Sequence, residues 1–198
     1  MNDTKIEDIE YKGCIIEKHY DFNPENPLED WDANGIFYHW KDNGQEEMLK
    51  YCELLGYDPD SREQTGEEHP DAVRIDKYEH SGVSYSVHGE GYYCRWDTSS
   101  TWAVWFPDDC LMDELKGLKG KKRRDKCIVY ARQACKLFNQ WANGDVYGFI
   151  VKDQSGNEID SCWGYFGDEA WEDALSECKH FIDEHIKEVG ALAPQLLA

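Results

Sequence analysis

The clearest hydrophobic pattern along the chain is helical and covers residues 121–143. Apolar side chains recur there every three or four positions, so they share one stripe of a helix. Residues 168–189 repeat this pattern, with Trp171 on the apolar stripe. Two shorter helices are predicted at residues 45–56 and 109–118, and Gly56 is suited to the end of the first. The spacing therefore predicts four helices.

Strands are predicted where β-branched and aromatic residues alternate with polar ones between turn residues. Such segments occupy residues 9–20, 35–40, 82–88, 92–96, 101–106, 146–152 and 159–166. Gly13 is expected to mark a turn or a bulge in the first segment. Gly148 and Gly164 lie inside the last two segments, and we expect them to allow close approach of a bulky ring such as that of Trp.

The order of these elements favours an α+β fold, because strands and helices come in runs rather than in strict alternation. We expect an antiparallel sheet of about five to seven strands with three or four helices packed mainly on one face. One domain is predicted over residues 1–189, followed by a tail at residues 190–198. Residues 58–72 are acidic and lack periodicity. An internal boundary, if the chain has one, is therefore expected in that loop.

Charge changes this picture more than any other property of the composition. The chain has 41 Asp and Glu against 21 Lys and Arg, a net charge of −20. Its 8 Trp, 12 Tyr and 7 Phe supply apolar surface for a core, which argues against a disordered acidic protein. The net charge is −14 over residues 1–80, +3 over residues 81–142 and −9 over residues 143–198. Self-repulsion on this scale indicates either a solubilising surface or a partner with a basic groove.

The chain is expected to be cytoplasmic. Its first residues are acidic and polar and lack the apolar segment of a signal peptide. It has no run of 18 apolar residues, so no membrane association is predicted. In that compartment the eight cysteines are expected to remain thiols.

No metal or other cofactor is predicted. Cys178, His180 and His185 come nearest to a ligand cluster, but the two histidines are five residues apart, which takes them off one helix face. Cysteines on apolar helix faces are interpreted as core residues. These are Cys52, Cys127, Cys135 and Cys178.

The sequence contains a weak match to a nuclease pattern. Pro107-Asp108 followed by Glu114-Leu115-Lys116 superficially matches the carboxylate pattern of metal-dependent nucleases. However, the second half falls on a predicted helix after a very short spacer. Asp108 is therefore better explained as a helix cap.

Aromatic residues indicate a possible ligand pocket. Trp96, Trp102, Trp105, Tyr147 and Trp163 are candidates to line it, with Asp97 and Asp160 as polar groups. Cys162 is a candidate thiol nucleophile in the same segment as Trp163, although its position in mid-strand favours core packing. On this hypothesis the protein is a small ligand- or nucleotide-handling enzyme. The central residues of its pocket would be Trp96, Asp97, Asp160, Cys162 and Trp163.

Basic residues are concentrated in residues 116–126, where seven of the eleven are Lys or Arg. Such a segment is able to bind phosphate. The overall negative charge opposes direct nucleic-acid binding. Pairing with acids of this chain or of a partner is therefore favoured.

Carboxylates on the outer face of the last helix are the strongest candidate for a working surface. They are Glu169, Glu172, Asp173, Glu177, Glu184 and Glu188, and the loop at residues 21–32 adds Glu29, Asp30 and Asp32. Duplex DNA carries about one charge per 1.7 Å of its axis, so rows of carboxylates can imitate its phosphates. An ordinary solvated helix face is the alternative explanation.

Several motifs resemble those of a known set of proteins. Tyr11-Lys12-Gly13 before an aliphatic strand, and Asn26-Pro27 followed by Trp31-Asp32 and Gly35, resemble the N-terminus of widespread acidic accessory proteins of bacteriophages, prophages and conjugative elements. Residues 93–99 and 144–148 are similar to the middle of those proteins, and residues 160–167 to their closing hairpin. The resemblance implies a mobile-element protein acting in the bacterial cytoplasm, and it brings no catalytic residue with it.

These observations favour a non-enzymatic inhibitor of a host defence system of restriction or CRISPR type. Its DNA-mimicking surface would occupy the groove of a basic nucleic-acid-binding host protein or complex. The aromatic-pocket enzyme is the first alternative. The second is an acidic adaptor that binds a basic host protein outside any nucleic-acid groove. The oligomeric state stays open.

Overall fold

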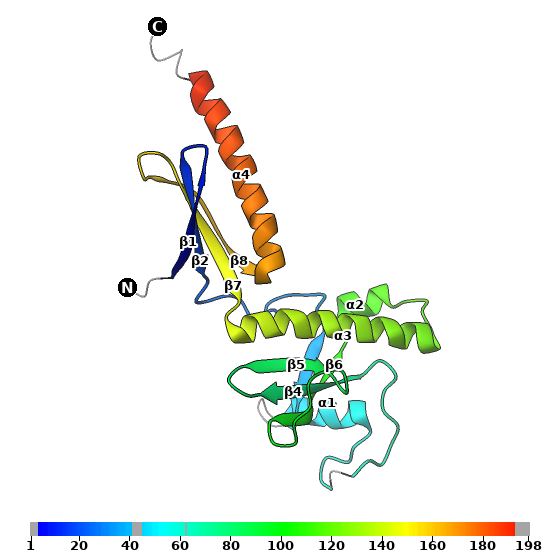
Figure 1. The fold of residues 1–198 in the computed structure, drawn as a ribbon. Helices are drawn as coiled ribbons and strands as arrows, with labels where there is room; N and C mark the ends of the chain where they lie inside the picture. Colours follow the sequence, from blue (N-terminus) through cyan, green and yellow to red (C-terminus); the bar gives the residue numbers. More distant parts are fainter. Residues whose placement is uncertain (1–3, 41–44, 62, 193–198) are drawn as a thin grey trace. The chain divides into compact units, whose positions relative to one another are not determined.

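The computed structural model describes residues 4–40, 45–61 and 63–192, with side chains up to residue 187 (Figure 1). The chain divides into two compact units. We name residues 1–24 with 144–198 the terminal unit, and residues 25–143 the central unit. Each unit contains one antiparallel four-stranded sheet. The predicted α+β class is therefore confirmed, but the strands are divided between two sheets of four.

The terminal unit consists of two hairpins and one long helix. Its elements are β1 (Lys5–Tyr11), β2 (Cys14–Tyr20), β7 (Val146–Lys152), β8 (Glu158–Phe166) and α4 (Gly167–Leu192). The strand order is β1-β2-β7-β8, so the N-terminal hairpin pairs with the hairpin that follows residue 144. Lys12 and Gly13 both have positive φ, as a tight hairpin turn requires. The expected turn at Gly13 is thus confirmed.

One face of this sheet packs against α4 (Figure 1). Ile16 of β2 pairs with Val151 of β7, and both are buried with Ala174, Cys178 and Ile182. Successive strand residues point to opposite faces. The alternate residues of β2, Glu17 and His19, therefore lie on the face that α4 does not cover.

Two strand glycines of the terminal unit have different explanations. A β-carbon added at Gly148 would overlap the ring of Trp163, which confirms the expected close approach. Gly164 differs from the expectation. No atom lies within 4 Å of the place where its β-carbon would be, and its φ of +88° is the reason for glycine there.

The central unit has helices on both faces of its sheet. Its elements are β3 (Ile36–His39), α1 (Gln45–Leu55), β4 (Val73–Glu79), β5 (Val83–Val87), β6 (Thr98–Phe106), α2 (Asp109–Glu114) and α3 (Gly120–Asn143). The strand order is β3-β6-β4-β5. Figure 1 shows α3 on one side of this sheet and α1 on the other.

The strand β6 explains why both faces are covered. Ala103 and Trp105 are buried in the core beneath α3, whereas Val104 is buried with Leu54 and Leu55 of α1. A strand that is apolar on both faces needs a layer on each side. The expected packing of helices mainly on one face therefore does not describe this unit.

Three further segments differ from their predictions or refine them. Residues 92–96, expected as a strand, form an exposed loop between β5 and β6. Residues 58–72 lie entirely within the central unit, whose ends in the chain are at residues 25 and 143. A bridge between Tyr57 and Gln64 fastens that loop. In the predicted tail, α4 continues to Leu192, and residues 193–198 lie outside the described chain.

Among the described helices, none is both long and apolar enough to cross a membrane.

Candidate functional site

The exposed face of α4 carries a row of carboxylates in its first three turns. Glu169, Glu172, Asp173 and Glu177 are all exposed, and no Lys or Arg lies between them in the sequence. The opposite face of the helix holds Trp171 and the other core residues, so packing orients the row away from the sheet. We call these four residues the α4 carboxylate row.

The remaining predicted acids do not extend this row uniformly. Glu184 is exposed, but its carboxylate is 2.7 Å from Lys187 Nζ. The side chain of Glu188 lies outside the described residues. Glu29, Asp30 and Asp32 are exposed but belong to the central unit. The predicted acidic surface is therefore divided between the two units.

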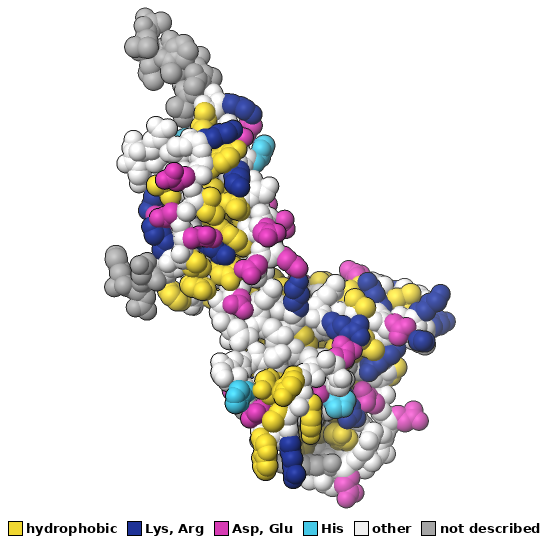
Figure 2. All heavy atoms as spheres, in the orientation of Figure 1, with side chains coloured by type: hydrophobic (Ala, Val, Ile, Leu, Met, Phe, Trp, Pro, Cys, Tyr) yellow, Lys and Arg dark blue, Asp and Glu magenta, His cyan; other side chains and the backbone are white. Residues whose placement is uncertain are grey.

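The terminal unit is the more acidic of the two. It has 18 Asp and Glu against 6 Lys and Arg, compared with 23 against 15 in the central unit. In the view of Figure 2, acidic side chains of the terminal unit are interspersed with hydrophobic and basic ones. The α4 row thus lies in the unit with the stronger negative field.

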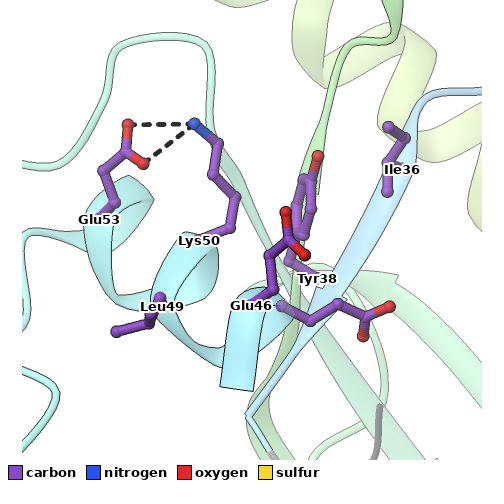
Figure 3. A pocket seen from close by; sticks show the side chains of 7 residues that line it. Ile36, Tyr38, Glu46, Leu49, Lys50 and Glu53 are labelled. Carbon is purple, nitrogen blue, oxygen red and sulfur yellow. Dashed lines mark hydrogen bonds and ion pairs between the residues drawn. The ribbon is translucent and has the colours of Figure 1, made fainter. Parts of the chain in front are cut away.

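A second acidic region lies in the central unit, between α1 and β3 (Figure 3). A hollow of about 660 Å³ is lined by Ile36, Tyr38, Glu46, Glu47, Leu49, Lys50 and Glu53. An adjoining hollow of about 350 Å³ shares Ile36, Tyr38 and Lys50 and continues to Asp32 and residues 106–110 and 112. We call the two together the α1–β3 groove.

Among the described residues that line this groove, Lys50 is the one basic side chain. Its Nζ donates to both carboxylate oxygens of Glu53, at 3.0 and 3.1 Å, as Figure 3 shows. One carboxylate oxygen of Glu47 is buried and accepts no hydrogen bond from the described residues. Burial raises the pKa of the Tyr38 phenol. The groove therefore combines a partly desolvated floor with an excess of negative charge.

The predicted pocket residues lie in different units. Trp96 and Asp97 belong to the central unit, whereas Asp160, Cys162 and Trp163 belong to the terminal unit. Cys162 is exposed on β8, which corrects the interpretation of its thiol as core packing. It pairs with the buried Phe149 of β7 and lies on β8, an edge strand of the sheet.

The other aromatic candidates serve mainly as core. Trp105 is fully buried and donates its Nε1 hydrogen to the Asn34 carbonyl at 2.8 Å. Trp102 is half-buried against the same core, and Tyr147 is buried in the terminal unit. Trp96, in contrast, is 84% exposed.

The nuclease-like segment forms a helix cap, as the favoured interpretation predicted. Asp108 is the N-cap of α2 and accepts from Leu111 N at 2.9 Å. Its other oxygen accepts from Gly35 N at 2.8 Å. Both carboxylate oxygens thus bond to backbone N–H groups.

The basic segment pairs partly with the chain's own acids. Arg123 contacts the buried Asp71, and Lys116 contacts Asp113 at 2.6 Å. Arg124 donates to the Ala72 carbonyl. In Figure 2 basic side chains gather over the first turns of α3. The expectation that these residues pair with acids of the same chain is confirmed at Arg123 and Lys116.

Metal-ligating residues do not assemble in the part of the chain that the structure describes. No group of three or more His, Cys, Asp or Glu side chains there is arranged to hold a metal ion. Cys178 is buried in the core while His180 is exposed on the outer face of α4. All eight cysteines are free thiols, and Cys52, Cys127, Cys135 and Cys178 are buried as predicted.

Sequence reasoning missed one paired acid and histidine. The buried carboxylate of Asp76 lies 2.9 Å from His88 Nδ1 and accepts from Thr101 N at 2.7 Å. The contact depends on the hairpin of β4 and β5, and residues 73–79 were not predicted as a strand. The α1–β3 groove was missed because its lining comes from separate segments.

Comparisons with known proteins found no matching family, curated protein or solved structure.

Proposed function

We propose that the protein is a non-enzymatic inhibitor that places the α4 carboxylate row in the nucleic-acid groove of a basic host protein. The observation that carries this proposal is the row itself. It consists of four exposed carboxylates on one helix face, in the unit with 18 acids against 6 bases. A core on the opposite face holds the helix in place.

The spacing of the row supports imitation of a single strand. From Glu169 to Glu177 a helix rises about 12 Å, at about 1.5 Å per residue. Over that length one DNA strand carries about four phosphates, at one per 3.4 Å, and both strands carry about seven. Four carboxylates therefore match one phosphate strand in linear density and fall short of a whole duplex.

The proposed class of target is a restriction or CRISPR-type complex. Its support is the similarity of the sequence motifs to those of acidic accessory proteins of mobile elements, together with the charge of −20. A nucleic-acid groove is lined with Lys and Arg that neutralise phosphates. A fixed carboxylate row replaces those phosphates without presenting a cleavable substrate.

The test measures binding and inhibition with a panel of purified restriction endonucleases and CRISPR effectors. We expect one or more to bind, to be inhibited in DNA cleavage, and to be released by duplex DNA. Affinity should fall at least tenfold between about 50 and 200 mM salt, because the contacts replace phosphate contacts.

A matched pair of variants distinguishes the effect of the α4 carboxylate row on binding from the effect of net charge. E169Q/E172Q/D173N/E177Q removes the row, and E7Q/E10Q/E63Q/E67Q removes the same number of exposed charges elsewhere. Only the first should abolish binding. Equal weakening by both would contradict the proposed surface. Binding that duplex DNA does not compete would indicate an adaptor instead of a mimic.

A further inference from the structure

The α1–β3 groove has a feature that the proposed use of α4 leaves unexplained, namely exposed apolar residues beside the acids. Ile36 is 40% exposed and Leu49 is 44% exposed, although both are large aliphatic residues. They come from β3 and α1, and both line the same hollow. Apolar surface of this kind, bordered by charged residues, is typical of an interaction site.

The charge of the lining is one-sided. Glu46, Glu47 and Glu53 come from α1, while Asp108 and Asp109 lie at the start of α2 and Asp32 in the loop before β3. Lys50 is already bound to Glu53. The buried Glu47 oxygen without a donor among the described residues needs a hydrogen bond that a ligand is able to supply. The groove therefore complements a cation.

The backbone beside the groove is an edge strand. Within the described chain, β3 pairs with β6 and with no other strand. An extended peptide can pair with a strand at the edge of a sheet. Ile36 and Tyr38, two residues apart on β3, both face the hollow. A peptide aligned with β3 would present its own alternate side chains to the same side.

We propose that the α1–β3 groove binds an extended, basic segment of a partner protein, with Lys or Arg at alternate positions. The apolar stems of these side chains cover Ile36 and Leu49, and their charged ends reach Glu46 and Glu47. Lys and Arg side chains commonly pack the aliphatic stem against apolar surface and keep the charged end exposed. The main chain of the segment bonds to the edge of β3, and β-branched residues at the intervening positions favour the extended conformation.

This inference is independent of the α4 carboxylate row. The groove is built wholly from residues of the central unit, and the row wholly from the terminal unit. The row is proposed to replace phosphates in a nucleic-acid groove, whereas the α1–β3 groove receives a peptide. Failure of one proposal therefore leaves the other intact.

The test uses the full-length chain and a fluorescent heptapeptide of alternating Lys and Val, with blocked ends. We expect saturable binding by fluorescence anisotropy and amide NMR shifts confined to β3, α1 and the start of α2. A peptide with Glu in place of Lys should not bind. Replacing the central Val with Pro should weaken binding at least tenfold, because Pro lacks the N–H needed for strand pairing.

Two variants that each introduce a lysine locate the site. Leu49→Lys places a cation in the groove and should weaken peptide binding at least tenfold. Val129→Lys makes the same change on the exposed face of α3, where Val129 is 39% exposed, and should leave binding unchanged. The E169Q/E172Q/D173N/E177Q variant should bind the peptide like the wild type.

Three results would overturn the inference. One is the absence of saturable binding up to about 1 mM peptide, the weak end of specific affinities. Another is equal loss in Leu49→Lys and Val129→Lys. The third is a set of NMR shifts centred on α4, since binding would then be a general attraction to negative charge.

Discussion

Asp71 is an acidic residue with a structural role in a chain whose acids are mostly exposed. It is 3% exposed and lies at the end of the loop that precedes β4. Arg123 donates to it through Nε at 2.8 Å and through Nη2 at 2.7 Å. These hydrogen bonds lower the pKa of the Asp71 carboxyl, outweighing the effect of burial. Arg123, one of the basic residues at 116–126, therefore has a structural role.

We predict that Asp71→Asn lowers the free energy of unfolding by about 3 kcal/mol at neutral pH, because it leaves the Arg123 charge without its partner. Urea denaturation measures the loss. The folded-state pKa of Asp71 is depressed, so its contribution is complete above the unfolded value of about 3.9 and is lost as pH falls below it. The difference between wild type and variant should therefore shrink as the pH falls below about 4.

Asp113→Asn serves as the control for this prediction. Asp113 pairs with Lys116 on the surface, and both side chains are exposed. Exposed pairs of this kind contribute little to stability. A comparable loss in both variants, or a difference that persists unchanged at low pH, would show that the Asp71–Arg123 pair does not act as described.

At the scale of elements, α2 depends on a single cap. The helix has six residues, and Asp108 accepts from Leu111 N within it and from Gly35 N outside it. A helix this short is not stable from its own hydrogen bonds. The carboxylate therefore fixes α2 to the segment that leads into β3.

We predict that Asp108→Ala destabilises the protein by about 1 to 2 kcal/mol, the usual effect of losing an N-cap. Asp108→Asn keeps an acceptor oxygen at the cap and should cost clearly less. Urea denaturation of both variants checks this ranking. Equal losses would indicate that the charge of Asp108 matters more than its cap hydrogen bond.

At the scale of the whole molecule, each compact unit has its own hydrophobic core. The cluster around Ile16 and Ile182 lies in the terminal unit, and the clusters around Trp105 and Leu55 lie in the central unit. The central unit is continuous in sequence, whereas the terminal unit is assembled from both ends of the chain.

We predict that residues 25–143 fold as an isolated fragment, because a domain with its own core needs no other part of the chain. The expected result is a cooperative urea transition together with near-ultraviolet circular dichroism from the buried Trp105. Residues 144–198 alone should not fold cooperatively, since β7 would lack its partner β2. A fragment 25–143 without a cooperative transition would contradict the independence of the central unit.

The sequence by itself determined most of the local elements, although it placed a strand at residues 92–96 and left out β4. Helical spacing located α1, α3 and α4, and alternation between turn residues located β7 and β8, because these signals depend on neighbours a few residues away. The outward carboxylates of α4 followed from the same periodicity. Their exposure at Glu169, Glu172, Asp173 and Glu177 is observed in the structure.

Only the tertiary structure decided how distant segments meet. The division of eight strands into two sheets follows from pairing β2 with β7 across more than 120 residues, and no local pattern specifies such a partner. The α1–β3 groove arises in the same way, because Ile36 and Leu49 acquire a common surface only when α1 packs beside β3. Side-chain periodicity reports which face of an element is apolar, whereas long-range packing decides what that face meets.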